Sequence, residues 1–172
     1  MVDMEKKVLS EIALYYGDIA MPKGFEIDRN KLQEDILKSH IKNIKFPSSR
    51  EWGKLTTYLR EHINLEYEFT LIPKITTGET YKPNEHSVSY LQLDPVDLQN
   101  SPDFVMLYGI HIAKDSCSVV IDYDDNRRKG RTWTIPLSNN KFILFPSTQR
   151  YYITNHQKDS LNFILTITYE FI

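Results

Sequence analysis

The second half of the chain is a series of short apolar or alternating segments separated by turn residues. Between Leu65 and Leu71 apolar and polar residues alternate, which is typical of a strand with one solvent-facing side. Further strand candidates cover residues 87–93, 104–113, 117–123, 131–135, 141–145, 150–154 and 161–171. Turn signals between them lie at 73–78, 94–95, 124–126, 138–140 and 156–160. About eight short strands at this spacing predict a β-sandwich or an open barrel.

The first third of the chain has helical periodicity instead. Three apolar stripes at helical spacing are Val8, Ile12 and Tyr15 or Tyr16; Leu32, Ile36 and Ile41; and Trp52, Leu55, Leu59 and Ile63. Gly17 and Pro22 would end the first helix, and Asp28 is the expected N-cap of the second. Ser48 and Glu51 have the spacing of a capping box before the third. We expect this third helix to cover a sheet.

Length and charge narrow the class of protein. With 172 residues, of which 41% are hydrophobic, the chain suits one domain (1–172) with a helical part (1–63) and a β part (64–172). A net charge of −2 offers no field for a polyanion, so we expect no nucleic-acid partner. Cys117 is the only cysteine, which excludes a disulfide framework and a multi-cysteine metal site. Without a signal peptide or a membrane span in the sequence, we expect no membrane association and a cytoplasmic location.

Residues 104–171 carry a resemblance to a known family. Their motifs are an apolar strand with Leu107-Tyr108-Gly109, an acidic turn with arginine at 122–128, a Phe145-Pro146-Ser147 turn and a last alternating strand at 166–171. In this order they resemble the 2-oxoglutarate/iron(II) oxygenases, especially small bacterial and phage members. The resemblance implies an α+β, mostly β fold. This is a double-stranded β-helix, jelly-roll or cupin-like, with N-terminal helices packed on one sheet. A phage-encoded protein would lie in the host cytoplasm or the virion.

The residues that bind the metal and the oxoacid in that family do not match here. The family supplies iron ligands as His-x-Asp/Glu on an early strand and a His after the Phe-Pro-Ser turn, where this chain has Tyr151. One register for the first pair is His86-Ser87-Val88, in which Val88 replaces the acid. A second is Ser101-Pro102-Asp103, which lacks the histidine. The resemblance therefore implies a degenerate metal site, with His86, Asp103 and His156 as the weak candidate ligands.

The oxoacid site is altered as well. The arginine that pairs with the far carboxylate of 2-oxoglutarate in the family falls near Asn162 or Ile164. Strand alternation could also point His111 into the barrel, although a buried, hydrogen-bonded histidine is the alternative. Candidate pocket residues are thus His111, Tyr151 and Asn162, and no cofactor is expected.

Two hypotheses about function follow from the resemblance. The first is an oxygenase-like protein without catalysis, a pseudoenzyme that serves in binding or assembly with a protein partner or as a homo-oligomer. Its candidate contact is the apolar strand 161–171, unless that strand is central and its composition is core. The second is an active oxygenase that uses iron(II) and 2-oxoglutarate as a hydroxylase. Its atypical metal site would be built from His86, Asp94 or Asp103, and His156.

The densest charge cluster is residues 122–131, which contains three aspartates followed by three arginines and a lysine. We expect a hairpin tip with solvated charges there. Its basic half would be available to a phosphate or an acidic partner.

Overall fold

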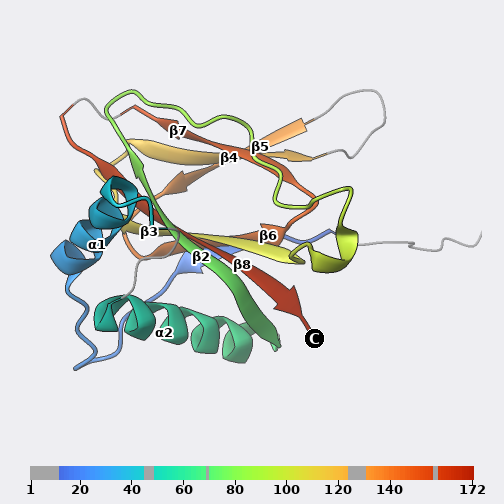
Figure 1. Cartoon of the computed structure of the whole chain (residues 1–172), viewed down its shortest axis with the longest axis horizontal. Coiled ribbons are helices and arrows are strands. Elements are labelled where there is room, and N and C mark those ends of the chain that lie inside the picture. The colour runs from blue at the N-terminus through green and yellow to red at the C-terminus, as the bar shows by residue number, and fades with distance from the viewer. Residues whose placement is uncertain (1–11, 45–48, 69, 124–130, 157–158) are drawn as a thin grey trace, which may run out of the picture.

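The computed structural model describes residues 12–44, 49–68, 70–123, 131–156 and 159–172. Within these ranges the helices are α1 (Arg29–Ile41) and α2 (Arg50–Tyr67), with a 3₁₀ turn at Leu98–Asn100. The strands are β1 (Tyr15–Asp18), β2 (Leu71–Tyr81), β3 (Phe104–His111), β4 (Cys117–Tyr123), β5 (Arg131–Leu137), β6 (Lys141–Pro146), β7 (Arg150–Asn155) and β8 (Asn162–Phe171). Figure 1 shows these elements in space.

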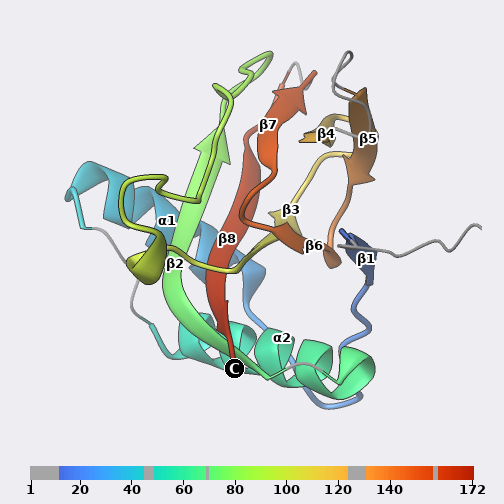
Figure 2. The ribbon, with the colours of Figure 1, turned by 90° about the vertical axis from the view of Figure 1, so that its right-hand side faces the viewer.

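The described strands form two antiparallel sheets that face each other. The larger sheet has the order β1-β6-β3-β8-β2, and the smaller has the order β5-β4-β7 (Figure 2). β8 pairs with β3 on one side and with β2 on the other. The apolar composition of this last strand is therefore that of a central strand, so β8 has no open edge for a partner.

Both helices pack on the face of the larger sheet that points away from the smaller one (Figure 1). Asp28 caps α1, and its side chain accepts a hydrogen bond from the Lys31 amide at 3.0 Å. The α2 stripe of Trp52, Leu55, Leu59 and Ile63 is buried, as its spacing predicts. α1 packs closely on β2, because a Cβ added to Gly78 of β2 would overlap with the Ile36 side chain of α1.

A second apolar cluster fills the space between the sheets. Its members are Tyr81, Val105, Leu107, Ile112, Cys117, Val119, Ile121, Ile135, Leu137, Ile143, Phe145, Tyr151, Ile153 and Ile164. The two clusters lie on opposite faces of the larger sheet because neighbouring side chains of a strand alternate.

Two predicted boundaries near the helices are wrong. Tyr15 and Tyr16 lie in β1 rather than in a first helix, whose remaining positions up to residue 11 lie outside the described residues. The cap of α2 is Ser49, one residue later than predicted, and it accepts from the Trp52 amide at 3.2 Å. Ile41 is 83% exposed, because it follows the buried Ile36 by five residues and so lies on another side of the helix.

The predicted strand at 65–71 is also wrong. α2 continues to Tyr67 and ends at Glu68, whose φ of 54° is left-handed. Between Lys54 and Tyr67 the chain has no glycine or proline that would end the helix earlier, and Leu65 is 84% exposed, so the alternation marks no buried strand face. The predicted loop at 73–78 belongs to β2. This edge strand accommodates Pro73 beside a bulge between Pro73 and Ile75.

The segment 87–93, which we expected to be a strand, runs beside β7 with a single bridge between Tyr90 and Tyr151. No helix in the described part of the chain is long and apolar enough to cross a membrane.

Candidate functional site

A group of polar side chains interrupts the apolar cluster between the sheets. It consists of Glu79 and Tyr81 on β2, Thr166 on β8, Tyr151 on β7, and Tyr90 and Gln92 on the segment beside β7. We call these six residues the inter-sheet cluster. Glu79 faces inward because it pairs with Ile164, which belongs to the apolar cluster between the sheets. The two sheets therefore bring an acid, three phenols, an amide and a hydroxyl to one region.

Tyr151 is at the centre of this group and is fully buried. Its hydroxyl oxygen accepts a hydrogen bond from Gln92 Nε2 at 3.1 Å. Its ring centroid lies 5.4 Å from that of Tyr90 and 5.1 Å from that of Phe145. Burial, with a smaller effect from the Glu79 charge, raises the pKa of Tyr151 above its usual value. Tyr151 is therefore a neutral phenol.

Glu79 provides the acid of the cluster. The Tyr81 hydroxyl donates to Glu79 Oε2 at 2.6 Å. Burial raises the pKa of Glu79, and the hydroxyls of Tyr81 and Thr166 and the charge of His40 only partly oppose this. Thr166 Oγ1 is buried near this carboxyl group, but its geometry to the described residues falls short of a full hydrogen bond. The carboxyl group is thus biased towards its protonated form.

Two of the three candidate metal ligands lie side by side. The rings of His86 and His156 are 5.2 Å apart between centroids, at an angle of 64°. The backbone N–H of Asn155 donates to His86 Nδ1 at 3.3 Å, so the neutral His86 ring carries its proton on Nε2. A metal-ligating histidine has the opposite arrangement, with one bare nitrogen on the metal and the other donating a hydrogen bond.

The candidate acids lie at the other end of β7. Asp103 Oδ2 accepts from the Phe171 amide at 2.8 Å, and its carbonyl oxygen accepts from Ser147. Asp94 is close to the same turn, because the Ser147 carbonyl accepts from the neighbouring Leu93 amide. β7 separates this turn from the two histidines by six residues, or about 20 Å of extended chain. The structure does not bring these acids to the histidine pair.

The other two pocket candidates, Asn162 and His111, contact neighbouring strands and turns. Asn162 is fully buried, where its Oδ1 accepts from the Ala113 amide at 2.9 Å and its Nδ2 donates to Ser116 and Asn155. This network ties the start of β8 to the ends of β3 and β7. His111 pairs with Phe163 and contacts its ring, which belongs to the cluster under the helices. His111 therefore does not point into the space between the sheets.

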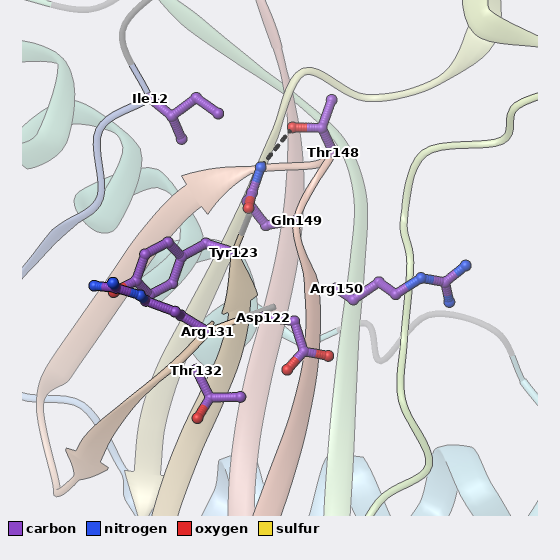
Figure 3. Close-up of a pocket in the computed structure, with 8 residues that line it drawn as sticks. All are labelled: Ile12, Asp122, Tyr123, Arg131, Thr132, Thr148, Gln149 and Arg150. Atoms are coloured by element: carbon purple, nitrogen blue, oxygen red, sulfur yellow. Dashed lines mark hydrogen bonds between the residues drawn. The ribbon is translucent and has the colours of Figure 1, made fainter. Parts of the chain in front are cut away.

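A pocket of about 540 Å³ lies at the end of the smaller sheet, and Figure 3 shows the residues that line it. We call it the mouth pocket. Its lining residues are Ile12, Asp122, Tyr123, Arg131, Thr132, Thr148, Gln149 and Arg150. Arg150, which precedes Tyr151 in β7, lines this pocket, whereas none of the six residues of the inter-sheet cluster does.

Comparison with solved structures identifies the architecture. AviO1 from Streptomyces viridochromogenes Tue57 aligns with a TM-score of 0.63 at 12% identity, over 92% of this chain and 90% of that one. The non-heme alpha ketoglutarate dependent carbocyclase SnoK gives 0.63 at 7% identity, over 92% and 79%. A Pseudomonas putida prolyl-4-hydroxylase gives 0.59 at 11%, over 83% and 80%.

The fold is that of the 2-oxoglutarate/iron(II) oxygenases. This confirms the double-stranded β-helix with helices packed on one sheet. No protein-family model and no curated protein sequence matches the chain.

The residues at the inter-sheet cluster do not fit an iron(II) centre. A non-haem iron oxygenase site uses two imidazoles and one carboxylate on one face of the metal. Here the residues that meet around Tyr151 offer neutral phenols and an amide. In the described ranges, no three His, Cys, Asp or Glu side chains come close enough to hold a metal ion.

Sequence reasoning found Tyr151 but missed Glu79, Tyr90 and Gln92. Glu79 gives no such signal, because Pro73 and Gly78 predict a loop for the residues that precede it. Tyr90 and Gln92 lie on the expected strand 87–93. Residues at positions i and i+2 of a strand face the same side, and this spacing is the signal that could have identified the pair.

Proposed function

We propose that this chain is a non-catalytic binding protein built on the oxygenase fold, in which Tyr90, Gln92 and Tyr151 replace the metal triad. The observation that carries the proposal is their arrangement. Tyr90 and Gln92 are separated by one residue on a segment that bridges to β7. Both side chains contact Tyr151 of β7. The family pattern of His-x-Asp/Glu followed by a distal His has the same form. In this chain Tyr90 and Gln92 would stand at the His-x-Asp/Glu positions, and Tyr151 at the position of the distal His.

The chemistry of these three side chains supports a role other than holding iron. A phenol binds iron(II) well only as phenolate, and burial opposes the loss of the proton from Tyr151 and from Tyr90. The Tyr151 oxygen already accepts the Gln92 amide hydrogen. A neutral hydrogen bond therefore joins Gln92 to Tyr151, and a ring contact joins Tyr90 to Tyr151, so none of the three groups offers a charged ligand to a metal.

A fold without its metal ligands keeps its pocket and its surfaces. The mouth pocket, which is lined by Arg150 at the start of β7, is the place where such a protein would hold a ligand. An assembly role with a protein partner or a second copy would have to use an edge other than β8. β2 is one edge of the larger sheet, and its Pro73, bulge and inward Glu79 are features that discourage strand pairing. We therefore favour ligand binding over assembly through the β2 edge.

The alternative, an active oxygenase with an atypical metal site, has one observation in its favour. His86 and His156 lie together, although the hydrogen bond at His86 Nδ1 opposes coordination through Nε2. This alternative predicts metal affinity that depends on His86.

Anaerobic calorimetric titration with iron(II) or manganese(II), with and without 2-oxoglutarate, tests the proposal. We expect no saturable binding at micromolar metal. Micromolar binding that is abolished by His86→Ala would establish the alternative. Micromolar binding that survives His86→Ala but is lost in Tyr151→Phe would place the metal at the inter-sheet cluster and also overturn the proposal.

A further inference from the structure

We propose that a small cavity under the helices binds a short-chain carboxylate such as acetate. The cavity has a volume of about 90 Å³ and lies between α1, α2, β3 and the segment that joins β1 to α1. We call it the helix-side cavity. Its polar lining residues are Arg29 and Tyr108, and its apolar ones are Met21, Ile27, Leu32, Leu55 and Ile110. It lies on the opposite face of the larger sheet from the inter-sheet cluster, so the inference goes beyond the proposed function.

One amide oxygen holds the two polar lining residues together. Arg29 Nη2 and the Tyr108 hydroxyl both donate to Asn140 Oδ1, the hydroxyl at 2.8 Å. Arg29 Nη1 donates to the Ile110 carbonyl oxygen. These contacts bring the guanidinium and the phenol side by side near the end of β3. The acceptors are neutral, so they orient the guanidinium without balancing its charge.

The charge of Arg29 is not balanced by another side chain of the described residues. Arg29 takes part in none of the ion pairs found among them. Two carboxylates near the start of α1 have other partners, because Asp28 accepts from the Lys31 amide and Glu51 accepts from the Asp28 amide. A half-buried charge is stabilised by a counter-charge, and an anionic ligand would supply it.

The size and the lining of the helix-side cavity select the ligand. Water occupies about 30 Å³ per molecule in the liquid, so the cavity has room for about three or four non-hydrogen atoms, the size of formate or acetate. A guanidinium fits a carboxylate through two parallel hydrogen bonds, and the apolar side chains cover a methyl group. Burial raises the pKa of Tyr108 to about 12, although the Arg29 charge opposes this, so the phenol is neutral and adds no negative charge. Of the lining residues Arg29 is the one cation, which suits a monoanion better than sulfate or phosphate.

Nuclear magnetic resonance titration of the methyl-labelled protein at neutral pH tests the proposal. Formate and acetate are the probes, acetamide is the neutral match of acetate, and pivalate is a carboxylate too large for the cavity. We expect saturable shifts of the Leu55 and Ile110 methyl signals with a dissociation constant of about 10 mM or tighter. The methyl signals of Ile164, on the other face of the larger sheet, should not move. Acetamide and pivalate should give no saturation.

Two variants separate the charge from the space. Arg29→Gln should weaken acetate binding by about tenfold or more, because a charge-assisted pair is lost. Arg50→Gln is the matched control, since Arg50 is the exposed first residue of α2 as Arg29 is the first residue of α1, and affinity should stay within about threefold. Ile27→Phe keeps every charge and fills the cavity from its half-buried rim, so it should abolish binding. Thermal denaturation shows whether each variant is folded.

The proposal is overturned if neither formate nor acetate gives saturable shifts at Leu55 and Ile110, or if acetamide or pivalate binds as well as acetate. Equal weakening by the two arginine variants would indicate non-specific attraction to surface charge and would overturn it too. Acetate binding that persists in folded Ile27→Phe would have the same meaning, and this variant decides the question where Arg29→Gln does not fold.

Discussion

The two faces of the larger sheet carry different kinds of interior. The face under α1 and α2 is mostly apolar, and among the described residues its buried Tyr169 hydroxyl has the Met106 sulfur, at 4.0 Å, as its one hydrogen-bond partner. The face towards β4, β5 and β7 holds Glu79, Tyr151 and Thr166 among its apolar side chains. Packing explains most of the first face. The second face holds polar groups that core packing does not require, and the proposed function rests on this difference.

The largest effect should come from the helix-covered face. Replacing Leu55 with Ala should lower the free energy of unfolding by about 2–5 kcal/mol, because Leu55 is 1% exposed and its loss leaves a cavity. Leu65→Ala is the matched control on the same helix. Leu65 is 84% exposed, so its replacement should change stability by less than about 0.5 kcal/mol. Urea denaturation measures both, and equal effects would show that α2 does not cover the sheet as described.

A pair of tyrosines compares the two faces directly. Tyr151→Phe should lower the free energy of unfolding by about 1 kcal/mol, because it removes the hydroxyl that accepts from Gln92 and leaves that amide without its partner. Tyr169→Phe should cost less than about 0.5 kcal/mol, because sulfur is a weak acceptor. A larger loss for Tyr169→Phe in the same denaturation experiment would remove the distinction between the faces.

The smallest effect is a pH dependence that comes from Glu79. Its raised pKa means that the folded state binds the proton more tightly than the unfolded state, whose glutamate pKa is near 4.3. The stabilisation is complete below the unfolded pKa and is lost as the pH rises through the folded pKa. Relative to Glu79→Gln, which cannot titrate, the native protein should therefore become less stable as the pH rises from 4 towards 8.

Urea denaturation of both proteins across this range measures the difference and cancels the titration of all other groups. A stability difference that stays constant with pH would show that Glu79 is ionised in the folded protein as freely as in the unfolded chain.

The fold could be predicted from the sequence where the signals were local. Trp52, Leu55 and Leu59 follow a helical period, and strands such as Cys117–Tyr123 are marked by turns on both sides. The β2 strand could not be predicted in this way. Pro73 and Gly78 suggest a loop, and only the edge position and the bulge make Pro73 acceptable, while the tight contact with Ile36 explains Gly78. These features depend on tertiary contacts, which leave no pattern in the local sequence.

The candidate site could be predicted only in part, for the same reason. Tyr151 follows from its distance to the Phe-Pro-Ser turn, and the structure places it at the centre of the inter-sheet cluster. Asn162 and His86 were reasonable candidates by position, but their partners are backbone and amide groups of neighbouring turns. Glu79, Tyr90 and Gln92 come from two segments that meet Tyr151 through strand pairing, which a single sequence does not specify.

The most direct test of the triad assignment is to restore the family pattern. The variant Tyr90→His/Gln92→Asp/Tyr151→His should bind iron(II) or manganese(II) at micromolar concentration in anaerobic calorimetry, while the native protein should not. Circular dichroism establishes that the variant is folded, and adding His86→Ala should leave its metal affinity unchanged. Micromolar metal binding by the native protein, or a folded triple variant that binds no metal, would contradict the assignment of Tyr90, Gln92 and Tyr151 to the metal positions.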